Sequence, residues 1–395
     1  MPPHATQAVD VAAGVDSSAA GKRMWLRTLR LENFRNYGRL EVELDHGLNF
    51  FHGTNGSGKT SILEAVSYLA VARSLRGSSD TEVVKWGERG FGVGGEARCG
   101  ETTIRIVLRF VRSEGKEVRV AGESLARLSD LVGVLRVAWF SPEDTWITKG
   151  GPAERRRLLD MTLCQLDSGY LTALANYKRT LRQRNEALLS WSPDEESDRI
   201  VDVWTDRLVK YGSRVVTARL AFLPLFAGCV SHAHSRISAV DTLELGYRGT
   251  VLSATDDEET AHSEGDVEEA FREALRRVSE DERRRGFTLL GPHRDDLDVR
   301  LNGRALRSFG SQGQHRTAAI ALKLGEAAAL DQNGQGVIVL LDDILSELDE
   351  TRAGALVELT EEFGQALMTS TGRLPEGVLK RSACFSVEAG EVVRE

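Results

Sequence analysis

The sequence predicts an α/β fold in which a mixed sheet with helices is interrupted by an inserted, mostly helical second domain. A glycine-rich loop at 53–60 lies between an apolar stretch at 48–51 and a helical pattern. A second apolar stretch, at 337–341, ends in two aspartates. Between them, from about residue 152 to 286, glycine becomes rare and leucines recur at helical spacing. The first two regions therefore belong to one sheet, and the helical region is an insertion.

The composition predicts a cytoplasmic protein with no membrane contact. The chain has 395 residues and a formal net charge of −8, which leaves room for a local nucleic-acid groove because the field of one face decides such binding. Four widely spaced cysteines predict neither a disulfide framework nor a metal site. No apolar run approaches the roughly eighteen residues needed to cross a bilayer. The small and polar residues at 1–22 predict a disordered leader.

Alternating residues predict two half-buried strands before the glycine-rich loop. Leu29 and Leu31 alternate with polar neighbours, and the alternation returns at 40–44. After the loop, a helix is expected at 60–73 with its apolar residues on one face. Alternation at 104–110 and 118–120, next to a glycine-rich stretch at 87–100, predicts an antiparallel sheet. A further apolar strand, at 137–140, stops at a Ser-Pro turn.

The glycine-rich loop GTNGSGKT fits the phosphate-binding pattern G-x-x-x-x-G-K-[ST] at every fixed position. Its glycines let backbone N–H groups face phosphate oxygens, and the helix start adds partial positive charge. We expect Lys59 to reach the β- and γ-phosphates and the Thr60 hydroxyl to bind Mg²⁺. The Lys-Thr pair disfavours the alternative of a purely structural glycine turn. The predicted nucleotide-binding residues are Gly53, Thr54, Asn55, Gly56, Ser57, Gly58, Lys59, Thr60 and Ser61.

The apolar strand at 337–341 has the pattern of a Walker B strand, because Asp342 and Asp343 follow it. Asp342 is predicted to hold Mg²⁺, and Asp343 to face the attacking water. Upstream, the segment GSQGQ at 310–314 precedes a long apolar-faced helix, in the order of an ABC-type signature motif. Its Ser311, Gly313 and Gln314 would form an anion site at a helix N-terminus. The alternative is an ordinary N-capped helix. The segment SELD at 346–349 matches the D-loop position.

These motifs together resemble the RecF family of DNA repair ATPases, which is related to SMC-type proteins. The resemblance covers nearly everything after Met24. The matching segments are LENFRNY at 31–37, GTNGSGKTSILEAV at 53–66, ARSLR at 72–76, FSPED at 140–144, GGPAERRRLLD at 150–160, GPHRDDL at 291–297, SQGQHR at 311–316 and LLDDILSELD at 340–349.

The resemblance implies an ABC-type ATPase head carrying a short helical second domain. RecF-like proteins bind ATP, dimerise on it, hydrolyse it slowly and bind DNA at single-strand/double-strand boundaries. They help to load the recombinase at gaps, with RecO and RecR as partners. The resemblance also implies that Lys59, Thr60 and Asp342 bind phosphate and Mg²⁺, and that Ser311 contacts the γ-phosphate held by the other subunit.

Three positions depart from the pattern of ABC-type relatives. Asp343 stands where many of them have a glutamate as catalytic base, which is consistent with slow hydrolysis. Thr371 is the candidate for the place of the switch histidine. Glu143 either replaces the missing Q-loop glutamine or caps the next helix, and the cap is the favoured role.

Several basic residues have two open interpretations. Arg35 and Arg76 either approach nucleotide or form ordinary ion pairs, and His293 and Arg294 either brace the head or touch DNA. Three local clusters either bind DNA phosphates without sequence preference or form solvated, ion-paired helix faces. They are Arg155, Arg156 and Arg157; Lys178, Arg179, Arg182 and Arg184; and Arg283, Arg284 and Arg285.

The function that fits these observations is an ATP-gated DNA clamp. The alternatives are an SMC-like or transporter-type ABC ATPase with a different cargo, and a small-molecule kinase that needs no signature motif. We expect a disordered leader at 1–22, the N-terminal part of the ATPase head at 23–138, a helical arm at 139–286 and the C-terminal part of the head at 287–395.

Overall fold

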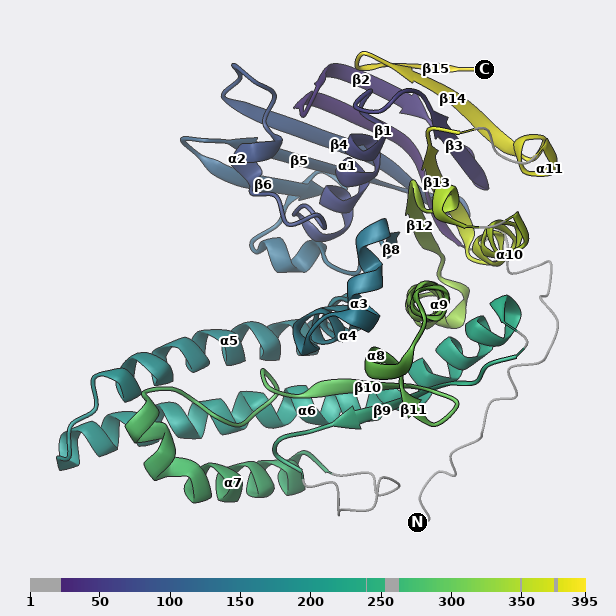
Figure 1. The fold of residues 1–395 in the computed structure, drawn as a ribbon. Coiled ribbons are helices and arrows are strands. Elements are labelled where there is room, and N and C mark those ends of the chain that lie inside the picture. The colour runs from purple at the N-terminus through teal and green to yellow at the C-terminus, as the bar shows by residue number, and fades with distance from the viewer. Residues whose placement is uncertain (1–22, 239, 253–262, 349, 373–375) are drawn as a thin grey trace, which may run out of the picture.

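A computed structural model describes residues 23–238, 240–252, 263–348, 350–372 and 376–395 (Figure 1). The leader expected at 1–22, and Asp349 of the D-loop segment, lie outside these residues. The described chain forms two large sheets with helices in the upper part of Figure 1, and an arm of helices below them.

The central sheet has six strands in the order β15-β14-β3-β13-β12-β8, and all run parallel except β15. The predicted strands at 48–51, 137–140 and 337–341 are confirmed as β3, β8 and β12. The order places β13 between β3 and β12, so the carboxyl ends of the phosphate-loop strand and the aspartate strand lie at the same edge. The bounds are β3 (Leu48–His52), β8 (Val137–Phe140), β12 (Val337–Asp342), β13 (Gly364–Ser370), β14 (Ser382–Glu388) and β15 (Glu391–Arg394).

The second sheet is antiparallel, as predicted, with the order β2-β1-β4-β5-β6-β7. The glycine-rich stretch at 87–100, to which no strand was assigned, contains the interior strand β4. Glycine is needed there, because a Cβ at Gly95 would lie 2.6 Å from a Leu69 methyl of the helix packed on the sheet. The bounds are β1 (Met24–Phe34), β2 (Tyr37–Glu43), β4 (Gly90–Cys99), β5 (Thr102–Val111), β6 (Gly115–Val120) and β7 (Glu123–Ser124).

Helix α1 (Lys59–Val71) lies between the two sheets and shares one core with both. It is buried on nearly all sides, and not only along one face as its sequence pattern suggests, because sheets cover it from two directions. On the other side of the central sheet, α9 (Gln312–Leu330) and α10 (Glu350–Glu361) share a second core with β12 and β13.

The inserted region is mostly helical, as expected, and is dominated by α6 (Glu195–Ile237), a helix of 43 residues. By length and composition, an 18-residue stretch of α6 could cross a membrane, so the expectation that no apolar run is long enough was wrong. In the structure α6 packs against α5, α7 and α9. The other arm helices are α3 (Thr145–Lys149), α4 (Pro152–Leu166), α5 (Ser168–Leu189) and α7 (Glu264–Arg285).

A small sheet of order β11-β10-β9 completes the arm core. Strand β9 (Leu243–Arg248) pairs antiparallel with β10 (Asp296–Leu301), which is followed by β11 (Arg304–Ala305) and α8 (Leu306–Phe309). This pairing crosses the boundary expected at residue 286. We therefore propose that the arm extends to Phe309.

Buried ion pairs hold the arm helices together. Arg184 of α5 is 3% exposed, and its Nη2 lies 2.6 Å from Oε2 of the fully buried Glu282 of α7. Arg155 of α4 pairs with Asp296 of β10 at 2.7 Å. Arg155 and Arg184 therefore form ion pairs, as one interpretation expected, but these pairs are buried inside the arm and not on a solvated helix face.

Replacing Arg184 with alanine is expected to destabilise the chain by about 3–5 kcal/mol, because Glu282 would remain buried without its partner. Urea unfolding followed by circular dichroism measures the loss. The matched control is Arg182→Ala, an exposed position on the same helix, which should change stability by less than about 0.5 kcal/mol. Equal losses in the two variants would contradict the role of the buried pair.

Candidate nucleotide-binding site

The glycine-rich loop takes its shape from backbone angles that suit glycine. Gly56 and Gly58 have φ angles of 79° and 116°, in the left-handed region. A Cβ at Gly58 would lie 2.5 Å from Nδ2 of Asn36, so a side chain has no room there.

The turn between β1 and β2 braces this loop from behind. The Asn36 side chain donates to the Ser57 carbonyl at 2.9 Å, and the Tyr37 hydroxyl donates to the Gly58 carbonyl at 3.1 Å. These two hydrogen bonds fix the carbonyls of Ser57 and Gly58, and thereby the shape of a loop of the kind that binds anions with its N–H groups. No role at the loop was predicted from the sequence for Asn36 or Tyr37.

Lys59 lies across the mouth of the loop. Its Nζ donates to the carbonyl oxygens of Gly53 and Thr54, each at 2.8 Å. Burial lowers the pKa of Lys59, while the nearby carboxylates of Asp343 and Asp342 raise it. Two loop carbonyls therefore hold the ammonium group, and the two aspartates act on it through their charge.

Thr60 and Asp342 meet directly. The Thr60 hydroxyl donates to Oδ1 of Asp342 at 2.7 Å, and the Thr369 hydroxyl of β13 donates to the same oxygen at 3.0 Å. Burial raises the pKa of Asp342, whereas the two threonine hydrogen bonds lower it. The structure thus brings together two oxygen groups that the sequence analysis assigned to Mg²⁺ from positions far apart in the chain.

Asp343 has a strained backbone and an unpaired side-chain oxygen. Its φ is 52°, a left-handed conformation that costs a non-glycine residue about 1–3 kcal/mol. The backbone N–H donates to both the carbonyl and the hydroxyl of Thr369, at 3.2 and 3.0 Å. Its Oδ1 is buried and makes no hydrogen bond to any residue that the structure describes. A buried carboxylate oxygen without a partner is unfavourable, so a polar ligand or water is expected beside it.

Two cavities meet at these residues. One, of about 600 Å³, is lined by the phosphate loop together with Arg35, Arg76, Asp343 and Thr371. The other, of about 540 Å³, reaches from Thr60 and both aspartates to Glu143. Thr371 therefore borders the site, as its candidate role requires.

Glu143 does not cap the next helix, contrary to the favoured interpretation. The side chain that accepts the Ser141 N–H is that of Asp144, at 2.7 Å. Burial raises the pKa of Asp144 to about 6. Glu143 instead lines the second cavity, where its charge contributes to the raised pKa of Asp342.

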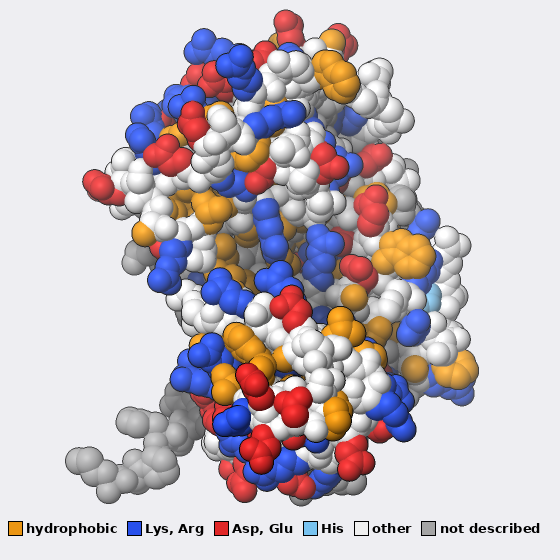
Figure 2. All heavy atoms as spheres, turned by 90° about the vertical axis from the view of Figure 1, so that its left-hand side faces the viewer, with side chains coloured by type: hydrophobic (Ala, Val, Ile, Leu, Met, Phe, Trp, Pro, Cys, Tyr) orange, Lys and Arg blue, Asp and Glu red, His pale blue; other side chains and the backbone are white. Residues whose placement is uncertain are grey.

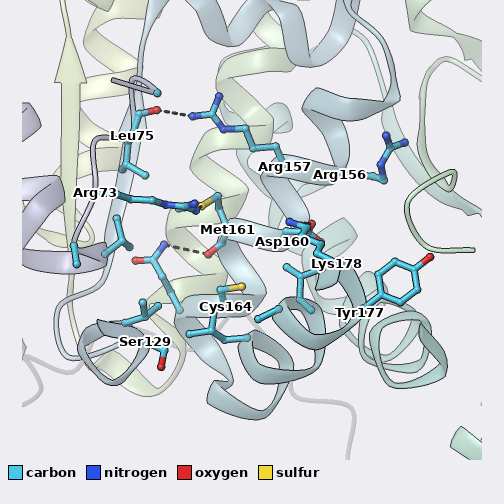
Figure 3. A pocket seen from close by; sticks show the side chains of 18 of the residues that line it. Arg73, Leu75, Ser129, Arg156, Arg157, Asp160, Met161, Cys164, Tyr177 and Lys178 are labelled. Atoms are coloured by element: carbon cyan, nitrogen blue, oxygen red, sulfur yellow. Dashed lines mark hydrogen bonds and ion pairs between the residues drawn. The ribbon is translucent and has the colours of Figure 1, made fainter. Parts of the chain in front are cut away.

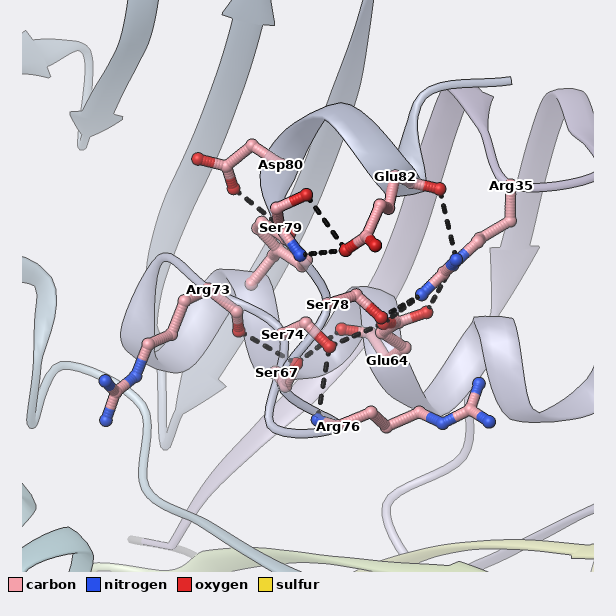
Figure 4. Close-up of polar contacts among 11 residues, drawn as sticks. Arg35, Glu64, Ser67, Arg73, Ser74, Arg76, Ser78, Ser79, Asp80 and Glu82 are labelled. Atoms are coloured by element: carbon pink, nitrogen blue, oxygen red, sulfur yellow. Dashed lines mark hydrogen bonds and ion pairs between the residues drawn. The ribbon is translucent and has the colours of Figure 1, made fainter. Parts of the chain in front are cut away.

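Arg35 forms an ion pair, which was one of its two interpretations. Its guanidinium donates to both oxygens of the fully buried Glu64, each at 2.7 Å (Figure 4). Glu64 also accepts the Ser74 hydroxyl, and this network ties the segment after α1 to the helix. The side chain of Arg76 points away from the network in Figure 4, and it lines both cavities.

The signature residues lie apart from the phosphate loop. Ser311 caps α9: its hydroxyl accepts the Gln314 N–H at 3.3 Å, and the Gln314 side chain accepts the Ser311 N–H at 3.0 Å. Ser311 and Gly313 are exposed, and neither they nor Gln314 line either cavity. The N-cap alternative is thus right as local structure, and within one chain these residues do not contact the loop.

His293 braces the arm, and not the head. Its Nδ1 lies 2.6 Å from the Tyr177 hydroxyl of α5. Burial lowers the pKa of His293 to about 4, so the ring is neutral near pH 7. Arg294 lies over the ring of Phe287, 5.5 Å from its centroid.

Trp86 is a further residue of the site that the sequence analysis missed. Its side chain is 98% exposed and lines the cavity of the phosphate loop. A tryptophan ring at the edge of a cavity offers a flat apolar face on which a ligand ring can stack. The signal was an aromatic residue between charged and glycine neighbours in KWGERG at 85–90.

Comparisons with known proteins agree with this geometry. The family model of the RecF/RecN/SMC N-terminal domain matches residues 25–374. The DNA replication and repair protein RecF of Salinibacter ruber is 41% identical over 360 residues, which cover 89% of this chain and 86% of that protein. RecF of an Exiguobacterium species is 36% identical over 378 residues, covering 94% of this chain and all (100%) of that protein.

Solved structures give the same result. A structure of the recombination mediator protein RecF with ATPrS in the RecFOR pathway has a TM-score of 0.86 and 31% identity, and covers 94% of this chain and 98% of that chain. The Smc head domain of Pyrococcus furiosus, with a TM-score of 0.54 and 15% identity over 94% of this chain and 96% of that one, shares the fold alone.

ATP is expected to quench the tryptophan fluorescence of the chain, because a base stacked on the exposed Trp86 ring changes its surroundings. Trp86→Phe should remove most of the quenching yet bind ATP within about tenfold of wild type, since aromatic pairs contribute only about 0.5–1.5 kcal/mol. Trp204→Phe, in the arm helix α6, is the matched control and should quench normally. Quenching that persists in Trp86→Phe would place the base elsewhere.

Proposed function

The chain belongs to the RecF family of DNA replication and repair proteins, and from this we propose that it is an ATP-gated DNA clamp. It is an ABC-type ATPase, and ATP is the nucleotide bound. In the proposed cycle two copies close around two ATP molecules, and hydrolysis opens them. The observation that carries the proposal is the contact between Thr60 and Asp342 beside the braced phosphate loop.

We propose that Thr60 and Asp342 hold Mg²⁺. Both offer oxygen ligands, which Mg²⁺ prefers, and a buried oxygen of Asp343 without a partner lies next to them. Bound Mg²⁺ would neutralise charge on the β- and γ-phosphates. The loop N–H groups and Lys59 would orient the phosphates on the other side.

Asp343 would orient the attacking water, and Glu143 lines the same cavity. The short side chain and strained backbone of Asp343 restrict the positions that its carboxylate can take relative to the attacking water. A slow rate of ATP hydrolysis suits a protein that uses ATP as a conformational switch better than it suits an enzyme of high turnover. In this proposal Thr371 takes the place of the switch histidine, and Glu143 that of the Q-loop glutamine.

The closed dimer would use the exposed start of α9. Ser311, Gly313 and Gln314 of one copy would contact the γ-phosphate held by the other, because a helix N-terminus with free N–H groups favours an anion. Two exposed aromatic residues, Trp146 and Phe309, lie on the short helices α3 and α8, which pack near α9. Their exposed fractions of 59% and 72% suit a surface that becomes covered on dimerisation.

We further propose that the clamp binds DNA at single-strand/double-strand boundaries and helps to load the recombinase in the cytoplasm, with RecO and RecR as partners. Relatives named as RecF in the RecFOR pathway support this assignment. A transporter-type role is less well supported, because the positions of the switch histidine and the Q-loop glutamine hold Thr371 and Glu143.

Lys59→Arg is expected to retain ATP binding but lose most hydrolysis. The loop N–H groups still hold the phosphates, whereas a planar guanidinium does not reproduce a compact ammonium between the Gly53 and Thr54 carbonyls. Filter binding and phosphate release measure the two activities. Lys85→Arg, outside the cavity lining, should behave as wild type. Wild-type hydrolysis by Lys59→Arg would remove Lys59 from its catalytic role.

Ser311→Arg is expected to bind ATP and remain monomeric, because a long cation at the α9 start would block the partner's phosphates. Sedimentation with and without ATP and Mg²⁺, repeated with gapped duplex DNA across a salt series, measures the association. Wild type and the control Ser190→Arg, at the far end of α5, should dimerise with ATP, with DNA strengthening the dimer and salt weakening it. Normal dimerisation of Ser311→Arg would overturn the two-subunit model.

A further inference from the structure

A further cavity lies between the head and the arm, and no residue of the phosphate loop lines it. It has a volume of about 980 Å³ and is formed by the segment after α1 together with α4 and α5. Figure 2 shows Lys and Arg side chains gathered over a hollow between the upper and lower parts of the molecule, and Figure 3 shows the cavity from close by. We propose that this cavity is a docking site for an acidic segment of a partner protein that also carries aliphatic side chains. The site is distinct from the ATP and DNA roles proposed above and does not depend on them.

The lining of the cavity carries an excess of positive charge. The basic side chains of the lining outnumber the acidic ones, although the whole chain has a net charge of −8. They are Arg73, Arg156, Arg157, Lys178 and Arg219, against Asp160 alone. Asp160 is already engaged by Arg219 at 2.7 Å, with Lys178 at 3.7 Å. The described wall therefore carries a strong excess of positive charge, and a negatively charged occupant would complement it.

The three remaining arginines donate to neutral acceptors. Arg73 contacts the sulfur of Met161 at 2.9 Å, Arg156 donates to the Asp295 carbonyl at 2.7 Å, and Arg157 donates to the Leu75 carbonyl at 2.5 Å. Within the described parts of the chain, none of the three has a carboxylate partner within 4 Å. Arg156 still interacts at longer range with the charges of Asp295, Asp296 and Asp160, and Arg157 with that of Glu326. None of these carboxylates forms a close ion pair with the two arginines, so their N–H groups can still donate to carboxylates from outside.

The apolar part of the lining favours an acidic peptide over a single-stranded nucleic acid as the occupant. It is aliphatic, with Leu75, Leu128, Val132, Met161, Leu171 and Leu174 among its residues. The aromatic side chain there, Tyr177, is buried, and its hydroxyl is bonded to His293. Single-stranded nucleic acids are usually held by bases stacked on aromatic faces, and the described lining offers no open one. Aliphatic side chains of a peptide fit such a wall better.

The lining also brings together separate segments of the chain. It takes residues from 72–76, 150–160 and 291–297, which lie far apart in the sequence. Three distant segments that converge on one charged, partly apolar hollow are more economically explained by a ligand than by packing, since packing would have filled the space.

The cavity also touches the nucleotide site. Leu75, Arg157, Met161 and Gln165 line both this cavity and the one that reaches Asp342. A bound segment would therefore contact side chains that also border the ATP side. If the two ligands influence each other, they must do so reciprocally.

The test uses a phage-displayed library of random peptides selected on the full-length protein. The expected result is enrichment of peptides rich in both acidic and aliphatic residues. The affinity of the best peptide is then measured by fluorescence anisotropy. Lys178→Glu should weaken it by roughly tenfold, while Arg179→Glu, the same charge change one residue along α5 but outside the lining, should weaken it by less than about twofold.

A second pair of variants tests the apolar contact. Leu128→Ser, in the lining, should weaken the peptide several-fold, and Leu189→Ser, exposed but outside the lining, should not. ATP binding and urea unfolding of each variant check that the fold is intact. Enriched peptides without acidic bias, or equal effects of Lys178→Glu and Arg179→Glu, would overturn the proposal. So would displacement of the peptide by oligothymidylate with the same dependence on Lys178, which would make the cavity a nucleic-acid site.

Discussion

The hydrogen bond from Thr60 to Asp342 joins residues 282 positions apart, with the whole arm inserted between them. It forms because β13 lies between β3 and β12, so the ends of the two functional strands share one edge of the parallel sheet. The other features of the site depend on this contact between Thr60 and Asp342. Asn36 and Tyr37 hold the loop that precedes Thr60, and Thr369 holds both Asp342 and the backbone of Asp343.

The sequence was sufficient where a pattern reports local geometry. The glycines and the Lys-Thr pair of the phosphate loop are required by the chemistry of phosphate binding. The five apolar residues before the two aspartates are required by burial of the strand on both of its faces. The sequence was insufficient where contacts between distant segments determine the structure or the role of a residue. Strand β4 was missed because its glycines resemble those of a loop, whereas in the structure Gly95 makes room for α1 to pack on the sheet. The roles of Asn36, Trp86 and Asp144 depend on their neighbours in the folded chain.

The arginine run at 155–157 illustrates the same limit. Successive residues on a helix point about 100° apart, so three neighbouring arginines enter three environments. Arg155 is buried against Asp296, Arg156 donates to a backbone carbonyl of the GPHRDD segment, and Arg157 reaches the segment after α1. Of the three arginines in this cluster, one therefore forms a structural ion pair and two line the cavity. The composition of the segment does not reveal these different roles.

Helix α6 belongs to two cores at once. Val209 and Phe226 pack in the arm, whereas Ala233 packs with the central sheet, and Gly325 of α9 lets the signature helix approach the backbone of Val230. At 1.5 Å per residue, 43 residues give a rod of about 65 Å, so a tilt of about 5° at the head end would move its far tip by about 6 Å. A small shift beside the signature helix would therefore produce a larger displacement at the tip of the arm if the helix, which contains Pro224, moved as one rod.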